Sequence, residues 1–300
     1  MWPYPVNWKR LRFGVEIEFV GGRPREVELL PGWVMALDEL QVDETGEESG
    51  SELQSPPLRW EERGQIREML ARLRAQGARA NWSCGLHVHV GLEPWGEDIV
   101  LPLIDAALSC QDALRELLRT SEHRLIFCPP VTREMRAKFI ADRAPSALLR
   151  RGRPQSHRTG INVAAWYDIG TVEIRYANGS LRYGEILRTV ELYLRFVAHV
   201  GAGKKLPGHP LQLAEALGAP DGGYPPPTAA PRWHRERMWL EEALIPALAP
   251  LVGERVPEGE IHSIFPVPEG LSVAVEMPDG RMVKRIVRPK TDGWKWLDRP

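Results

Sequence analysis

The sequence predicts an α+β chain in which strands and helices are interspersed. Three segments far apart in the sequence, residues 12–20, 85–91 and 171–176, alternate apolar and polar residues with a period of two. Such alternation is typical of a strand with one buried face. Between and after these segments, longer stretches carry apolar residues at helical spacing. The two patterns together indicate helices packed on a sheet that has one apolar and one polar face.

The first of these strands carries two carboxylates. In the segment RFGVEIEFV, four apolar residues alternate with Glu16 and Glu18. Successive side chains of a strand point to opposite faces, so both glutamates share one face and the apolar residues pack the other. An ordinary amphipathic strand with a solvated outer face would give the same pattern, so this segment alone does not establish a site.

The same arrangement recurs twice. The segment GLHVHVG places His87 and His89 on one face, and TVEIRY places Glu173 and Arg175 on one face. A solvent-facing sheet surface usually carries Thr, Lys, Ser and Gln as well. These three strands instead present pairs of side chains that can bind metal or phosphate, which points to one shared site.

Composition limits the class of protein. With 300 residues, 43% hydrophobic and 26% charged, the chain can bury a sizeable core as one large domain with an appendage, or as two domains. The formal net charge of −1 argues against a general nucleic-acid binder. No apolar run is long enough for a bilayer, and Pro3, Pro5 and Lys9 interrupt any signal-peptide pattern, so we expect a cytoplasmic protein. Three cysteines do not suggest a disulfide framework.

The chain after the first strand predicts a strand at 33–37, a hairpin or mobile loop over the acidic run 43–52, and a short strand ended by prolines at 52–57. Glu52 is either the tail of the solvated acidic loop or a further ligand delivered to the first strand's carboxylates. A helix is predicted over 61–76, with Gly77 as its stop.

The second polar-faced strand also permits a zinc interpretation. Cys84, His87 and His89 form a C-x-x-H-x-H pattern. In an extended strand, however, Cys84 points away from both histidines, unless Gly85 bulges the strand. A pair of structural histidines that only make hydrogen bonds is the other alternative.

A helix over 99–120 precedes the most basic stretch of the chain, residues 133–158. This stretch is either a solvated helix face with a flexible basic loop or a loop that faces phosphate and closes over a site, since guanidinium groups bind phosphate oxygens in pairs. Two strands, 160–164 with Asn162 and 171–176, then follow, joined by a turn at 168–170. A long helix is predicted over 183–200.

Beyond residue 205 the character of the chain changes. We expect a short helix at 211–217, a Gly- and Pro-rich linker or surface loop at 218–231, a helix at 233–251, and a small β-unit at 261–288 followed by a Trp-rich tail. This region is either an appendage that binds a partner or substrate, or a packing strap.

Five motifs of this chain resemble, in order, those of the amidoligase branch of the carboxylate–amine ligase superfamily, which includes glutamine synthetase and glutamate–cysteine ligase. The resemblance runs from about residue 12 to 200 and rests on Gly14–Phe19, Trp33–Asp38, Glu52–Leu58, Asn81–Val90, and Asn162 with Thr171–Arg175. It implies a curved, mostly antiparallel sheet with helices on its outer face and a site in the concave face. The implied division is an amidoligase-like catalytic domain at 1–205 and a C-terminal helical and β appendage at 206–300.

The resemblance also implies roles for single residues. Glu16, His87 and Glu173 would hold a divalent metal beside the transferred phosphate, and Glu18 and Glu52 a second metal on the substrate side. The metal would be Mg²⁺, and an imidazole among the ligands would also admit Mn²⁺.

The resemblance implies that three of the residues are catalytic. Arg175 would stabilise the phosphoryl group during its transfer, and His89 would contact the ATP phosphates. Glu52 is the third. The candidates for holding ATP or an acidic substrate are side chains that can donate hydrogen bonds to anionic oxygens: Arg124, Arg150, Arg151, Arg158 and Asn162.

Two functional hypotheses result. The first is an ATP-dependent carboxylate–amine ligase that forms an amide or isopeptide bond through an acyl-phosphate, with a small molecule or peptide as substrate. The further glutamates and the ammonia-binding loop of glutamine synthetases are missing, so free ammonia is not the expected amine. The second is a metal-dependent hydrolase that uses the same Glu/His cluster to activate water. A catalytically dead scaffold is disfavoured because all three polar pairs are intact, and the basic loop favours the ligase.

Overall fold

The computed structural model describes residues 1–39, 41–149, 158–277 and 281–297. These residues form two compact units, the first from residues 1–149 and 158–229 and the second from residues 230–297. Each unit has a hydrophobic core of its own. The two units are therefore described separately.

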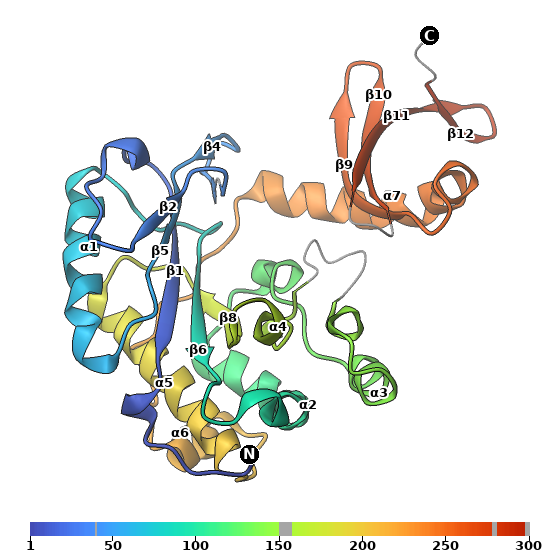
Figure 1. Ribbon diagram of the computed structural model, residues 1–300. Helices are drawn as coiled ribbons and strands as arrows, with labels where there is room; N and C mark the ends of the chain where they lie inside the picture. Colours follow the sequence, from blue (N-terminus) through green and yellow to red (C-terminus); the bar gives the residue numbers. More distant parts are fainter. Residues whose placement is uncertain (40, 150–157, 278–280, 298–300) are drawn as a thin grey trace. The chain divides into compact units, whose positions relative to one another are not determined.

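The first unit is built on a six-stranded sheet with the order β2-β5-β1-β6-β8-β7, in which every neighbouring pair is antiparallel. Its strands are β1 (Phe13–Phe19), β2 (Val34–Ala36), β5 (Ser51–Gln54), β6 (Gly85–Gly91), β7 (Ile161–Asn162) and β8 (Thr171–Asn178). The three strands with polar pairs, β1, β6 and β8, lie side by side at the centre of this sheet (Figure 1).

One face of this sheet is apolar and packs on helices. In β1 the apolar residues are buried and the intervening Gly14, Glu16 and Glu18 are half-buried, which confirms the alternation in the sequence. The helices of this layer are α1 (Gly64–Ala75), α2 (Val100–Leu118) and α5 (Tyr183–Gly201). α5 packs against β6, and α2 packs against β8. The apolar side chains of both layers form one core, so the polar pairs are left on the opposite face.

Shorter elements surround this framework. α3 (Arg133–Ala141) follows α2, and α6 (Pro210–Leu217) packs on α2 and α5. The acidic run forms a hairpin of β3 (Gln41–Val42) and β4 (Glu48–Ser49), one of the two predicted alternatives. The turn predicted at 168–170 is wrong, because α4 (Ala165–Ile169) joins β7 to β8. Gly170 ends α4 with φ +74°, a conformation that glycine adopts without a steric penalty.

The second unit combines one helix with a four-stranded antiparallel sheet of order β12-β11-β10-β9. The elements are α7 (Arg232–Arg255), β9 (Glu260–Val267), β10 (Gly270–Glu276), β11 (Met282–Lys290) and β12 (Gly293–Trp296). Leu248 and Val252 of α7 pack on Val273, Val287 and Trp296 of the sheet. This arrangement confirms the predicted helix and small β-unit.

The α+β class and the antiparallel sheet with helices on one face are confirmed. The compact units divide the chain after Ala229, whereas the expected boundary was at residue 205, because α6 packs with the first unit. No helix in the part of the chain that the structure describes is long and apolar enough to cross a membrane.

Candidate active site

Strand register brings the polar pairs together. In the antiparallel sheet Glu16 stands opposite His87, and Glu18 stands opposite Glu52. On the other side of β6, His89 stands opposite Glu173. Residues that are distant in sequence therefore become cross-strand neighbours on one face, as the parity of the three strands predicted.

Glu16 lies at the centre of the cluster. Its Oε2 is 3.0 Å from His87 Nδ1, and its Oε1 is 3.1 Å from His89 Nε2. The His87 ring also approaches two other carboxylates, with Nε2 3.5 Å from Glu18 Oε1 and Nδ1 3.7 Å from Glu173 Oε1. Glu52 Oε2 lies 4.0 Å from His87 Nδ1. One buried imidazole thus contacts or approaches all four glutamates.

Glu173 is fully buried and is held on both oxygens. Its Oε1 accepts a hydrogen bond from Arg175 Nη1, and its Oε2 accepts one from Asn162 Nδ2 at 2.8 Å. Burial would raise the pKa of Glu173, but the charge of Arg175, with a smaller effect of His87, holds it below its usual value. Glu173 is therefore a fixed, ionised carboxylate.

A register shift places Arg175 in this cluster. Leu86 pairs with Ala177 and Val88 pairs with Ile174, so Arg175 and Tyr176 together stand opposite His87 alone. This is a β-bulge, a feature that re-aims side chains beside functional sites. The bulge accompanies the close approach of the Arg175 guanidinium to Glu173.

Glu18 and Glu52 occupy the other end of the cluster. Glu18 Oε2 accepts a hydrogen bond from the backbone N–H of Gly85, and Glu52 Oε1 accepts one from Gln54 Nε2 at 2.7 Å. Burial, together with the negative charges of Glu16 and Glu18, raises the pKa of Glu52 to about 8. In contrast, burial would raise the pKa of Glu16, but its bonds to His87 and His89 lower it far below the usual value.

This donor set fits a divalent metal. Two groups of three side chains each offer ligand atoms within 4.8 Å of one another: Glu16, His89 and Glu173, and Glu16, Glu52 and His87. Carboxylate oxygens are the ligands that Mg²⁺ prefers, and imidazole also suits Mn²⁺. Burial is the largest cause of the raised pKa of Glu52 and the like charges of Glu16 and Glu18 are the next, and a cation would offset those charges. Metal binding itself stays a prediction.

The zinc interpretation gains no support. Cys84 belongs to neither group of possible ligands among the described residues. Its thiol is buried and lies 3.3 Å from Asn81 Oδ1, and burial raises its pKa to about 12.

The predicted arginines have different environments. Arg124 is 2% exposed and lies in a 3-10 helix, Glu122–Ile126. A Cβ built on Gly85 would lie 2.1 Å from Arg124 Nη2, and Gly85 shares its strand face with His87. The Arg124 guanidinium therefore borders the cluster, whereas Arg158 is exposed. Arg150 and Arg151 lie outside the described residues.

Three residues of the site were not predicted. Thr171 Oγ1 is 2.9 Å from His89 Nδ1, Gln54 holds Glu52, and the Gly85 N–H holds Glu18. Each stands two residues from a predicted site residue on the same strand, so strand parity places all three on the polar face. The same alternation of faces along each strand could have identified these three residues from the sequence.

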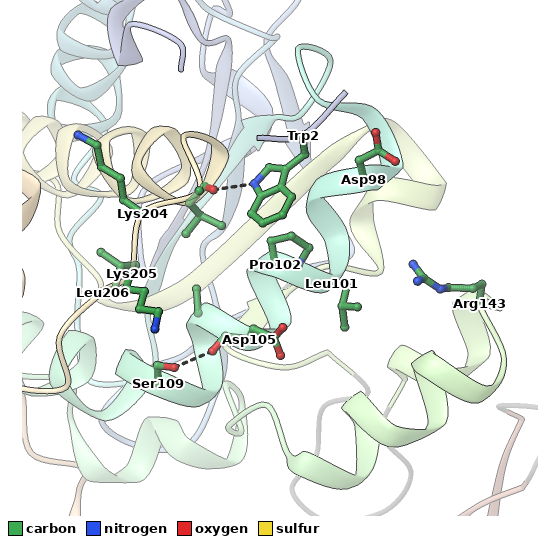
Figure 2. A pocket seen from close by; sticks show the side chains of 13 residues that line it. Trp2, Asp98, Leu101, Pro102, Asp105, Ser109, Arg143, Lys204, Lys205 and Leu206 are labelled. Atoms are coloured by element: carbon green, nitrogen blue, oxygen red, sulfur yellow. Dashed lines mark hydrogen bonds between the residues drawn. The ribbon is translucent and has the colours of Figure 1, made fainter. Parts of the chain in front are cut away.

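A separate pocket opens between α2 and the chain that follows α5 (Figure 2). Its volume is about 710 Å³, and its lining includes Trp2, Leu101 and Pro102 with Lys204 and Lys205 at the side. No described residue of the Glu/His cluster lines it. The pocket is therefore distinct from the candidate active site.

Comparisons with known proteins gave a weak structural similarity and a family match. One solved structure, the complex between the prokaryotic ubiquitin-like protein Pup and its ligase PafA, has 14% sequence identity to this chain and a TM-score of 0.26. The similarity covers 67% of this chain and 49% of the other, so the chain spans about half the length of that protein. No curated protein matches the chain.

A family model described as "Putative amidoligase enzyme" matches residues 25–197. The matched region is more than half of the chain and contains Glu52, both histidines of β6, Asn162 and the Glu173–Arg175 pair, whereas Glu16 and Glu18 precede it. This chain belongs to the amidoligase family.

Proposed function

We propose that this protein is an ATP-dependent carboxylate–amine ligase that forms an amide or isopeptide bond through an acyl-phosphate. Placement in the glutamine synthetase and glutamate–cysteine ligase superfamily, with a sheet of that kind, is part of the proposal. The observation that carries it is the convergence of four glutamates, two histidines and Arg175 on one sheet face in an amidoligase-family chain.

The reaction has two steps. A carboxylate oxygen attacks the γ-phosphorus of ATP and ADP leaves, then an amine nitrogen attacks the acyl carbon and inorganic phosphate leaves with the acyl oxygen. A divalent cation bound by these carboxylates supplies charge neutralisation of the phosphate oxygens. The residues that would hold it are Glu16, His89 and Glu173, with Glu52 and His87 around a second position. Glu18 is proposed to assist at that second position.

The chain's own groups have distinct tasks. Arg175 stays ionised, because the negative charges of Glu173 and Glu18 outweigh the effect of burial and raise its pKa. We assign to it the stabilisation of negative charge on the transferred phosphoryl group. Arg124, buried beside Gly85, is a second fixed cation for an anionic part of ATP or substrate. His89 is oriented by Thr171, and it is proposed to help hold the cation that neutralises the phosphates.

The test is amine-dependent ADP release from ATP in the presence of Mg²⁺ and pooled carboxylates and amines. We expect Glu173→Gln to abolish the release and to leave the circular dichroism spectrum unchanged, because the variant keeps the shape and loses the charge. The matched control is Glu122→Gln, an exposed glutamate on the 3-10 helix that carries Arg124. Normal turnover by Glu173→Gln would reject the proposal, and ATP-independent bond cleavage would favour a metal-dependent hydrolase.

A further inference from the structure

The second unit has an uneven distribution of charge. Residues 281–297, which contain β11 and β12, carry six basic residues and one acidic residue. Residues 230–277 of the same unit carry four basic and eight acidic residues. Among the described residues of this unit, the net positive charge is therefore concentrated on one pair of strands.

The register of these strands places four of the six cations on one face, whereas Arg285 has the parity of the opposite face. In β11, residues two apart share a face, so Lys284, Arg288 and Lys290 lie on the side opposite Val287. Val287 is fully buried against α7 and Trp296, which identifies the inner face. Lys295 of β12 stands directly opposite Arg288 and joins the outer set. We call these four exposed residues, Lys284, Arg288, Lys290 and Lys295, the β11–β12 basic face.

The acidic residues that the structure describes neutralise little of the basic face. Among the acidic residues that the structure describes, Asp292 alone forms an ion pair with it, at 3.5 Å from Lys290 Nζ and with both side chains exposed. Directly opposed like charges such as Arg288 and Lys295 destabilise a sheet. A bound anion would relieve that repulsion.

The shape of the face indicates an extended polypeptide. Positions on one face of a strand recur every two residues, or about 6.6 Å, and side chains on one side of an extended peptide have the same repeat. On β11 the cations occupy three of four successive positions of this kind, at Lys284, Arg288 and Lys290. Ile286, half-buried between Lys284 and Arg288, adds apolar surface to the row. These features match a peptide with acidic residues at alternate positions.

A single-stranded nucleic acid fits less well. Proteins that bind single-stranded nucleic acids without sequence preference use exposed aromatic side chains on which the bases stack. Phe265 is 42% exposed and stands opposite Ser272 on this side of the sheet. The Arg237 guanidinium lies 4.9 Å from the centre of its ring, so this ring is not open to a base. The chain also has a net charge of −1, without the overall positive field of a nucleic-acid binder.

We propose that the β11–β12 basic face is a docking surface for an acidic, extended polypeptide segment of a partner protein. Affinity comes from charge pairs with Lys284, Arg288, Lys290 and Lys295, and binding weakens as salt screens them. The proposal concerns binding alone and does not depend on the ligase reaction.

The test is fluorescence anisotropy with the full chain and a labelled peptide of alternating glutamate and serine. We expect the double variant Arg288→Gln and Lys295→Gln to bind this peptide about fivefold more weakly, as expected for the loss of two exposed charge pairs. The double variant should melt no earlier than wild type, because it removes a like-charge pair. Arg288→Glu should abolish binding.

The matched control is the double variant Arg25→Gln and Arg235→Gln, which removes two positive charges at exposed positions outside the basic face. This control should bind the acidic peptide as wild type does. An absence of peptide binding by wild type, equal weakening in the control, or tighter binding of an oligothymidylate of equal charge would each overturn the proposal.

Discussion

The side-chain amide of Asn162 donates to Glu173 Oε2 at 2.8 Å, while its Oδ1 accepts from the backbone N–H of Ala164 at 3.2 Å. Asn162 therefore ties Glu173 to the loop between β7 and α4. The resemblance implied that this asparagine helps to hold ATP or an acidic substrate, and from these hydrogen bonds we propose that it positions Glu173. Groups that orient metal ligands in this way commonly affect activity as strongly as weaker ligands do.

We predict that Asn162→Asp lowers kcat/KM for amine-dependent ADP release by about 100-fold. The variant keeps the acceptor for Ala164 but replaces the donor with a second carboxylate beside buried Glu173. Steady-state kinetics measure the effect, and a chelator titration should show weaker Mn²⁺ binding. Asn7→Asp, which adds the same charge at an exposed position, is the control. Unchanged metal binding in Asn162→Asp would contradict the positioning role.

Thr171 offers a second test of orientation. Its hydroxyl is 2.9 Å from His89 Nδ1, and this contact fixes the ring whose Nε2 meets Glu16. Thr171→Val should lower kcat/KM about tenfold, and Thr171→Ser, which keeps the hydroxyl, should restore most of it. Thr291→Val, at an exposed turn of the second unit, should be neutral. Equal activity of the Val and Ser variants would show that the hydroxyl has no role.

We predict that the free energy of unfolding depends on pH because Glu52 has different pKa values in the folded and unfolded states. Its pKa is about 8 in the folded chain against an ordinary value of 4.5, so between these values the folded state binds more protons than the unfolded state. The contribution of Glu52 to the free energy of unfolding in metal-free buffer should then fall as pH rises, by about 1 kcal/mol per unit between pH 6 and 7.5. His123 and His199, whose pKa values burial lowers, act in the opposite direction, so the contribution of Glu52 is the difference between wild type and Glu52→Gln. Glu16 and Glu173 have lowered pKa values, so their contributions are constant over this range.

Urea denaturation at several pH values measures this slope. Glu52→Gln should make the curve flatter than that of wild type and should be the more stable protein at pH 8, because the amide cannot ionise. Glu47→Gln, in the exposed acidic hairpin, should retain the wild-type slope. An unchanged slope in Glu52→Gln would show that Glu52 is ionised throughout this range.

We predict that substitutions at Gly85 and Arg124 have coupled effects on the free energy of unfolding. A Cβ at Gly85 would lie 2.1 Å from Arg124 Nη2, so Gly85→Ala must displace a buried guanidinium and should cost about 1–3 kcal/mol of stability. In an Arg124→Met background the same change should cost clearly less, which a double-mutant cycle in urea measures. Gly184→Ala, at a helical glycine with open space around it, is the control. Additive effects of the two changes would refute the contact.

Much of the site followed from strand parity. The alternation in β1, β6 and β8 predicted which side chains share a face, because that depends only on local backbone geometry. Parity could not predict the bulge at Arg175 and Tyr176, since a register shift depends on the partner strand. The turn expected at residues 168–170 failed for a related reason. Five residues with weak local preference, Ala165–Ile169, form α4 in the context of the fold.

The sequence alone determined the secondary structure of the main elements, the polar face of the sheet and the chemical types gathered on it, because these depend on local periodicity and residue identity. Only the tertiary structure decided the strand order β5-β1-β6-β8, and with it which carboxylate meets which imidazole. Tertiary structure also decided that Asn162 holds Glu173, that Arg124 is buried beside Gly85 and that Arg288 faces Lys295. Those contacts join residues distant in the chain, and their geometry depends on packing that no single segment encodes.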